Sequence, residues 1–327
     1  MRSRTFAMGI LMTVLAVGAV GAVDAQAPVW PNRPVKIVVA YPPGGSTDIA
    51  ARLLADRLGK TLGQRVYVEN HGGAGGTIGA LSVVRADPDG YTLLFAASPE
   101  VSIAPITMKT MQYDPVTDLA PITLVGTVPF VLVANTGFAP DTLRELIDYA
   151  HANPGKVNYS SYGINTSNHL FGELFKFNAG IDAVHVPYQG SSPSLLGLIG
   201  GQVQYTFDTL AATLPYIKSG KLKAIAVATP QRNANLPNVP TMAEAGLPGF
   251  VGGTWFGLLA PAKTPKPIID AINADVVAAL RSPEVRKAFA DSNIIPVGDT
   301  PEEFSQFMRS EVSKWRELAA KVGIVAK

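Results

Sequence analysis

The sequence contains no cysteine, and this absence excludes several features at once. No disulfide can stabilise the fold, so stability has to come from a packed core. A cysteine nucleophile and a thiolate metal site are excluded as well. Hydrophobic residues make up 47% of the 327-residue chain and charged residues 16%. These proportions are typical of a globular protein with a large core.

Basic runs and metal-binding motifs are also missing. The formal net charge is +2 and no cluster of lysine and arginine stands out, which argues against nucleic acid as a partner. None of the four histidines, His71, His151, His169 and His185, has the spacing of a known metal motif. We therefore expect neither a metal nor a cofactor.

The first residues have the pattern of an export signal. Arg2 and Arg4 precede an apolar run at residues 6–23, and the Ala25-x-Ala27 spacing suits signal peptidase. A membrane anchor is the alternative, but the run is short and no charged stop follows it. We predict a signal peptide at residues 1–27, cleavage after Ala27 and a periplasmic protein.

Strands and helices alternate along the rest of the chain. The apolar, β-branched segment 35–40 predicts a strand buried on both faces, and a helix at 47–62 follows it. The alternation resumes at a strand over 131–134 and a helix over 142–151. This order predicts an α/β fold with parallel strands, in two lobes. Three later helices are predicted to begin with a capping residue and a proline, at Thr264-Pro265, Ser282-Pro283 and Thr300-Pro301.

Two loops that follow strands are rich in hydrogen-bond donors. The first loop, residues 41–48, combines Gly44 and Gly45 with Ser46 and Thr47 at the start of a helix. The positive end of that helix suits an anion, although a tight turn capped by Ser46 or Thr47 fits the residues equally well. A second such loop, residues 160–169, is dense in hydroxyl and amide groups. Facing each other across a cleft, the two loops could hold a carboxylate without an arginine.

Motifs for nucleotides and for catalysis fail on inspection. The glycine-rich loop 72–79 has Ile78 where a dinucleotide fingerprint needs glycine, and no Gly-Lys-Ser/Thr follows it. The segment 44–48 lacks the last glycine of a nucleophile elbow. Asp48 and Asp208 could form an acid–base pair. The alternative is that Asp48 accepts hydrogen bonds at a helix start and that Asp208 braces a strand end.

Several segments in order resemble the substrate-binding proteins of tripartite tricarboxylate transporters, the Bug family. Singly they are weak signals, but their order along the whole mature chain is specific. They are Trp30-Pro31-x-x-Pro34-Val35, Tyr41-Pro42-Pro43-Gly44-Gly45-x-x-Asp48, Gly73-Ala74-Gly75-Gly76, Pro88-Asp89-Gly90-Tyr91, Asn168-His169-Leu170, Val186-Pro187-Tyr188-Gln189-Gly190, Gly220-Lys221-Leu222 and Trp255-x-Gly257-Leu258.

The resemblance implies a type II periplasmic-binding-protein fold that clamps a small carboxylate between two lobes. Lobe 1 would comprise residues 28–130 and 254–327, and lobe 2 residues 131–253. The resemblance also implies a set of ligand-binding residues: Tyr41, Gly45, Ser46, Asp48, Ser161, Gly163, Asn165, Thr166, His169, Tyr188, Asp208 and Trp255. Asn165 departs from the family, which usually has glycine at this position.

These observations favour a binding protein that delivers its ligand to membrane permease subunits and acts as a monomer, without catalysis. The ligand stays open among dicarboxylates, tricarboxylates, amino acids and aromatic acids. Two alternatives remain: a receptor that presents its ligand to a signalling protein, and a hydrolase or isomerase that uses Asp48 and His169.

Overall fold

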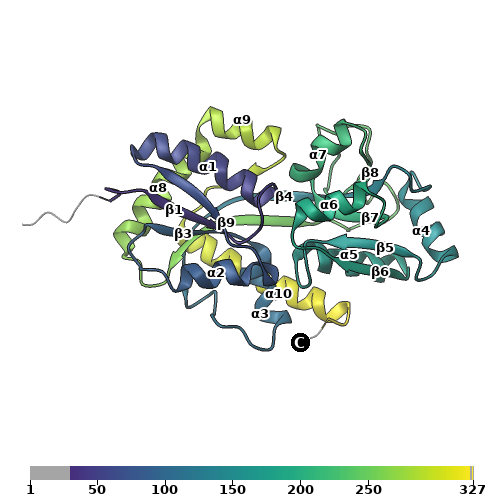
Figure 1. The fold of residues 1–327 in the computed structure, drawn as a ribbon, viewed down its shortest axis with the longest axis horizontal. Helices are drawn as coiled ribbons and strands as arrows, with labels where there is room; N and C mark the ends of the chain where they lie inside the picture. The colour runs from purple at the N-terminus through teal and green to yellow at the C-terminus, as the bar shows by residue number, and fades with distance from the viewer. Residues whose placement is uncertain (1–29, 325, 327) are drawn as a thin grey trace, which may run out of the picture.

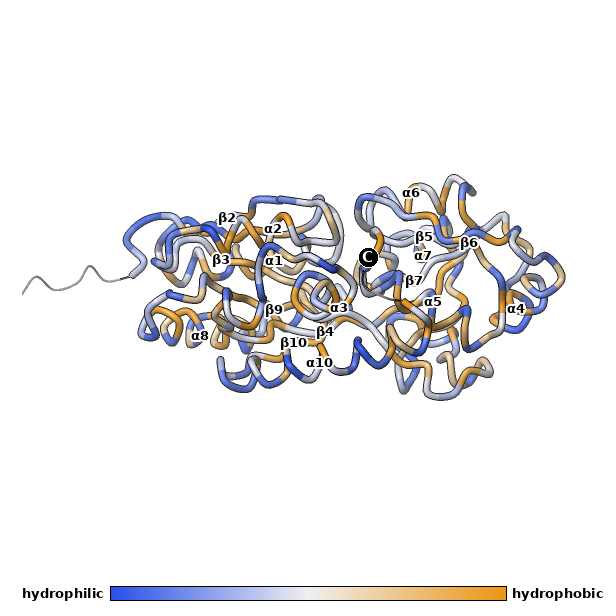
Figure 2. The backbone as a smooth tube through the Cα atoms, turned by 90° about the horizontal axis from the view of Figure 1, so that it is seen from below, coloured by the Kyte–Doolittle hydropathy of each residue, from blue (hydrophilic) through white to orange (hydrophobic). Residues whose placement is uncertain are grey.

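The computed structural model describes residues 30–324 and 326, so the predicted signal peptide lies outside the described residues. Two α/β lobes lie side by side along the long axis of the molecule, and strands β4 and β9 run between them (Figure 1). The view from below shows the same two halves, with β4 and α10 near the middle (Figure 2). Within this described part of the chain, no helix is both long and apolar enough to cross a bilayer.

The first lobe is built on parallel strands, as the alternation of elements predicts. β1 pairs in parallel with β2 on one side and β3 on the other. Its elements are β1 (Val35–Val39), α1 (Ser46–Leu62), β2 (Val66–Asn70), η1 (Ala74–Gly76), α2 (Thr77–Val84), β3 (Thr92–Ala97), η2 (Pro99–Ile103), α3 (Ala104–Thr107), α8 (Lys266–Arg281), α9 (Pro283–Asp291), β10 (Ile295–Pro296) and α10 (Pro301–Lys321).

The second lobe repeats this plan. β5 pairs in parallel with β6 and with β7, and helices follow each of the three strands. Its elements are α4 (Leu143–Ala152), β5 (Val157–Ser161), α5 (Ser167–Ala179), β6 (Ala183–Pro187), α6 (Ser191–Ile199), β7 (Tyr205–Thr209), α7 (Leu210–Lys218) and β8 (Leu222–Val227).

Two long strands join the lobes. β4 (Leu119–Asn135) pairs with β9 (Gly253–Pro261) through its first part and with β7 and β8 through its last residues. The sequence predicts only residues 131–134 of β4, because Pro121 and Gly126 interrupt the apolar pattern. The register shifts at both interruptions, which is how a strand accommodates such residues. We propose that the lobe boundaries at 130/131 and 253/254 fall inside these crossing strands.

Each lobe has its own core, and a smaller cluster connects them. Ile37 and Val39 of β1 pack on one face of the sheet and Val38 on the other, which confirms that β1 is buried on both faces. A separate cluster brings Ile103 of η2 and Trp315 of α10 against Leu170 of α5. All three residues are almost fully buried. This contact ties the second lobe to the C-terminal helix beside the crossing strands.

The predicted helix starts are confirmed in two of three cases. Ser282 caps α9, and Thr300 forms a capping box with Glu303 at the start of α10. The third prediction is wrong, because Pro265 itself occupies the capping position of α8. The helix begins one residue later than predicted, with a second proline in its first turn. A proline is tolerated there because first-turn N–H groups have no partner within the helix.

β9 approaches β4 closely at Gly253, where the chain crosses between the lobes. A Cβ atom built on Gly253 would lie 2.2 Å from the backbone oxygen of Val128 on the neighbouring strand. We predict that Gly253→Ala lowers the free energy of unfolding by about 1–3 kcal/mol, the usual cost of overpacking. Urea unfolding followed by circular dichroism measures this change.

Gly59→Ala in α1 is the matched control. A Cβ atom at Gly59 has ordinary contacts, the nearest at 3.4 Å. Because alanine favours a helix interior over glycine, the control should be neutral or stabilising by up to about 1 kcal/mol. An equal loss in both variants would show that the close approach at Gly253 is unimportant.

Candidate functional site

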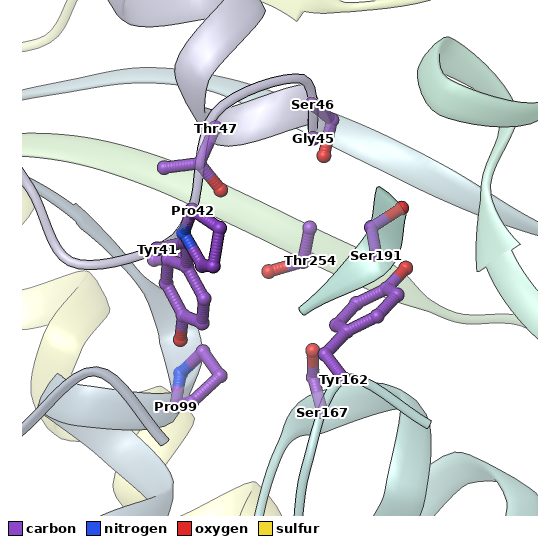
Figure 3. Close-up of a pocket in the computed structure, with 11 residues that line it drawn as sticks. Tyr41, Pro42, Gly45, Ser46, Thr47, Pro99, Tyr162, Ser167, Ser191 and Thr254 are labelled. Carbon is purple, nitrogen blue, oxygen red and sulfur yellow. The ribbon is translucent and has the colours of Figure 1, made fainter. Parts of the chain in front are cut away.

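Three helices begin at the same space between the lobes. The first helical residue is a serine in each: Ser46 of α1, Ser167 of α5 and Ser191 of α6. All three serines line one pocket with an empty volume of about 380 Å³. Figure 3 shows their side chains around this pocket together with Thr254 of β9. The pocket therefore receives residues from both lobes and from a crossing strand.

None of the three helix starts is capped by a side chain. The residues before the three helices, Gly45, Thr166 and Gly190, make no side-chain capping hydrogen bond. The alternative prediction, a turn capped by Ser46 or Thr47, is therefore wrong, since the capping position is Gly45. First-turn N–H groups and helix dipoles attract anions. No lysine, arginine or histidine is among the described residues that line the pocket.

The loop that leads into α1 needs glycine at one position. Gly44 has φ +89°, and a Cβ atom there would lie 2.9 Å from the Ser192 hydroxyl of the other lobe. The carboxylate of Asp48 fixes this loop from behind, accepting hydrogen bonds from the Gly44 N–H, Arg52 and Asn70. Burial opposes the charge, but these donors outweigh it and lower the pKa of Asp48. Asp48 thus shapes the loop and does not line the pocket.

The loop that leads into α5 is also held from behind. The Thr166 hydroxyl donates to the Gly163 carbonyl at 2.7 Å, and Ser161 contacts Gly163 and His185. Asn165 has φ +64°, a left-handed conformation that asparagine tolerates better than most residues. Asparagine can therefore occupy a backbone position that glycine also adopts readily.

His169 belongs to this supporting layer. Its Nδ1 accepts a hydrogen bond from the Asn165 N–H, and its ring stacks on His185 with centroids 4.1 Å apart. Burial lowers the pKa of His185 to about 3, so this ring is neutral at physiological pH. His169 is absent from the lining of the pocket.

A tyrosine and a buried carboxylate form the wall of the second lobe. Tyr162 lines the pocket and donates its hydroxyl hydrogen to Asp208, which also accepts from Ser191 at 2.8 Å and from Thr209. Burial raises the pKa of Asp208 to about 6, although these donors favour its charged form. Asp208 sits near the end of β7 and braces that strand end, as the alternative reading predicts.

The first lobe carries a similar pair. Tyr41 lines the pocket, and its hydroxyl lies 2.8 Å from Oε2 of Glu100, a fully buried residue of η2. The other carboxylate oxygen of Glu100 accepts from the Ala97 N–H at 2.7 Å. Burial raises the pKa of Glu100 to about 7. Sequence reasoning did not select Glu100, although a lone acid in the apolar segment 93–104 was a visible signal.

Trp255 does not face the cleft. Its side chain is 2% exposed and its Nε1 donates to Glu311 of α10 at 3.1 Å. Side chains alternate along a strand, so the neighbouring Thr254 faces the pocket and Trp255 packs into the core. The prediction of Trp255 as a wall residue is therefore wrong by one position.

The two lobes touch at the rim of the pocket. The Ser192 hydroxyl of α6 donates to the Pro43 carbonyl at 3.1 Å. A second hollow with an empty volume of about 700 Å³ adjoins the pocket and shares Tyr41 and Tyr162 with it. Its lining includes Tyr188 and the glycine-rich segment 73–76. The lobes are thus already in contact across the cleft.

The structure separates the predicted ligand-binding residues into three groups. Tyr41, Gly45 and Ser46 line the pocket, and Gly163 and Tyr188 line the adjoining hollow. The other seven, in neither lining, are Asp48, Ser161, Asn165, Thr166, His169, Asp208 and Trp255. Ser167, Ser191 and Tyr162 line the pocket and were missed. In the described ranges, 30–324 and 326, no group of three or more acidic or histidine side chains is placed to hold a metal ion.

Comparisons with known proteins agree with this geometry. Residues 50–324 match the family model described as tripartite tricarboxylate transporter family receptor. The protein BugT of Bordetella pertussis is 38% identical over 307 residues, which cover 94% of each chain.

Two solved structures of Rhodopseudomonas palustris proteins are also similar. Rpa4515 with adipate shares 34% identity and a TM-score of 0.89, over 91% of this chain and 100% of that one. MatC with bound malate shares 35% identity and a TM-score of 0.84, over 88% and 99%.

Two lobes around a pocket rich in neutral donors define a solute-binding protein. The chain belongs to the receptor family of tripartite tricarboxylate transporters, and it is a solute-binding receptor of that kind. The two-lobe fold and the resemblance to Bug proteins are therefore confirmed. This is a family of binding proteins, so the hydrolase or isomerase hypothesis with Asp48 and His169 is wrong.

The Tyr162–Asp208 pair generates a prediction about stability. Since the folded-state pKa of Asp208 is raised, folded Asp208 binds its proton more tightly than unfolded Asp208 does, and its stabilising contribution is lost as pH rises through about 6. Tyr162→Phe removes a donor from the charged form. We predict a loss of about 1–3 kcal/mol at about pH 8 and a smaller loss at about pH 4, measured by urea unfolding.

Tyr188→Phe serves as the control. The Tyr188 hydroxyl donates to the side chain of Gln202 at 3.0 Å in a solvent-exposed contact. Its removal should cost no more than about 0.5 kcal/mol at either pH, as for other surface substitutions. A Tyr162→Phe loss that does not change with pH would contradict the assigned role of Asp208.

Proposed function

We propose that the receptor captures a small carboxylate in the pocket lined by Ser46, Ser167 and Ser191. The observation that supports this most directly is the convergence of three uncapped helix starts on a space without a cation. Hydroxyl groups and first-turn N–H groups would donate to the carboxylate oxygens. Hydrogen bonds to a charged group are the stronger kind, so several neutral donors replace an arginine.

The proposed ligand is a linear dicarboxylate. Two relatives were solved with such acids, adipate and malate. Apart from its hydroxyl groups, the pocket is lined by Pro42, Ala97, Pro99 and the rings of Tyr41 and Tyr162. These apolar groups suit the methylene carbons between two carboxylates. One carboxylate would lie at the helix starts and the other toward the adjoining hollow.

Both lobes contribute donors, so closure of the lobes completes the site. α1 belongs to the first lobe, whereas α5 and α6 belong to the second. A ligand favours the closed form only through contacts that it makes there and not in the open form. We propose that the closed, loaded form is the one that the membrane permease subunits recognise, and that the receptor acts as a monomer.

Thermal unfolding with increasing adipate or malate tests this proposal. Binding to the folded state raises the unfolding midpoint in a concentration-dependent way. We predict that Ser46→Ala weakens binding of the acid that gives the shift by about 1–3 kcal/mol, or about 5- to 150-fold in Kd, because a charged acceptor loses a donor. Calorimetric titration measures the Kd.

The control variant is Ser219→Ala, an exposed serine whose hydroxyl donates to the Tyr216 carbonyl. It should bind the acid as the wild-type protein does. Equal Kd values for Ser46→Ala and the wild type would show that the carboxylate lies elsewhere. No shift with either acid would contradict the proposed ligand class.

We also propose that the receptor reaches the periplasm by means of the signal at residues 1–27. The basic start, the apolar run and the Ala25-x-Ala27 site support this proposal, and receptors of this family work in the periplasm. We predict that protein from a periplasmic extract begins at Pro28, as measured by mass spectrometry of the intact chain. A full-length mass in that extract would contradict cleavage after Ala27.

A further inference from the structure

A carboxyl group without a cationic partner is buried directly behind the cleft wall. Glu100 is 0% exposed, and its carboxylate accepts from the Ala97 N–H at 2.7 Å, from the Tyr41 hydroxyl at 2.8 Å and from its own backbone N–H. No cation in the described part of the chain acts on it. An ionised carboxylate in such a place is costly, because a low-dielectric environment favours the neutral form.

The hydroxyl of Tyr41 has too few hydrogens for its neighbours. Its oxygen lies 2.8 Å from Glu100 Oε2 and 3.3 Å from the carbonyl oxygen of Gly75. Both neighbours are acceptors when Glu100 is ionised, and a hydroxyl has one hydrogen to give. With a proton on Glu100, Glu100 donates to Tyr41 and Tyr41 donates to Gly75. The geometry therefore has a place for one additional proton.

The buried carboxylate of the other lobe has no such place. Asp208 accepts from the hydroxyls of Tyr162, Ser191 and Thr209 and from the Thr209 N–H. Four donors support its charged form. Glu100 is the buried acid beside the cleft whose surroundings match the neutral form.

Among the titratable groups around Glu100, Tyr41 is the one placed to share a proton with its carboxylate. β3, η1, α3 and α10 pack against η2, and the first three carry no titratable side chain. α5 touches η2 through Leu170, and its titratable groups contact other partners: His169 stacks on His185, and Glu173 pairs with Lys176. On α10, Glu311 is the buried acid, and it is held by the indole groups of Trp255 and Trp315 and by Lys314 at 2.9 Å. The Tyr113 hydroxyl donates to the backbone oxygen of Glu100 at 2.6 Å.

We propose that the cleft binds a proton together with its carboxylate ligand and that Glu100 holds this proton. The inference rests on the proposed function. Tyr41 would pass its hydroxyl hydrogen to Glu100 and take one from solvent in the cleft, which leaves the tyrosine neutral. A neutral Glu100 removes the repulsion between two negative charges in a poorly screened space. The receptor would thus bind a dicarboxylate plus one proton.

Burial raises the pKa of Glu100 to about 7, so the protonation state of Glu100 changes near neutral pH. A bound anion nearby raises the pKa further, because a like charge disfavours ionisation. Above about pH 7 the empty receptor therefore loses a proton that the loaded receptor keeps. The affinity should then fall with rising pH, toward about tenfold per pH unit while the loaded form stays protonated.

Calorimetric titration of adipate in buffers of different ionisation enthalpy measures the proton count. At about pH 8 adipate is fully ionised, so an absorbed proton comes from the buffer and not from the ligand. We expect net uptake of up to about one proton per adipate by the wild-type receptor. In Glu100→Gln the amide can donate to Tyr41 as the neutral acid does. This variant should show no uptake and a Kd that does not change between about pH 7 and about pH 9.

Glu173→Gln is the matched control. Glu173 also accepts from a tyrosine hydroxyl, that of Tyr159 at 2.5 Å, but Lys176 pairs with it at 3.0 Å and it lines neither the pocket nor the adjoining hollow. It should keep the wild-type uptake. Adipate binding without uptake by the wild type, or with equal uptake by Glu100→Gln, overturns this inference and leaves the proposed function intact. Failure of the wild type to bind either adipate or malate overturns both.

Discussion

The starts of three helices, each with first-turn N–H donors, lie at one space between the lobes, and the proposed function depends on bringing them together there. α1 comes from one lobe, and α5 and α6 from the other. None of the three capping positions uses its own side chain to satisfy these donors. A carboxylate would supply the missing acceptors, and helix dipoles favour its charge. Since neither lobe holds all three helices, the proposed binding site exists only where the lobes meet.

The crossing strands position the pocket, and two buried acids determine the negative charge beside it. β4 and β9 pass between the lobes, and Thr254 of β9 forms part of the pocket. Tyr41 and Tyr162 face the pocket from opposite lobes, and each hydroxyl contacts a buried carboxyl group, Glu100 or Asp208. Those acids are negative or neutral but never positive. In the proposed function, an anion is therefore held by neutral donors, and the negative charge of the nearby acids is controlled.

Much of this architecture could be predicted from the sequence, because it follows from local patterns. The segment 35–40 reads as a buried strand, and the glycine and hydroxyl residues after it mark a donor-rich helix start. Side-chain direction was less predictable. Thr254 and Trp255 are neighbours, and strand register alone decides that Thr254 faces the cleft. Glu100 stood out as a lone acid in an apolar segment, but the roles of Glu100 and Tyr162 could not be predicted. They arise from contacts between residues distant in sequence, 59 positions for Tyr41–Glu100 and 46 for Tyr162–Asp208.

The central claim is that neutral donors at three helix starts hold the carboxylate of the ligand. A crystal structure of the receptor grown with adipate tests it most directly. The account predicts one carboxylate within hydrogen-bonding distance of Ser46, Ser167 and Ser191 or of the first-turn N–H groups, with no lysine or arginine in contact with it. Adipate held at that end by a lysine or arginine, or bound outside the pocket between the lobes, would contradict the account.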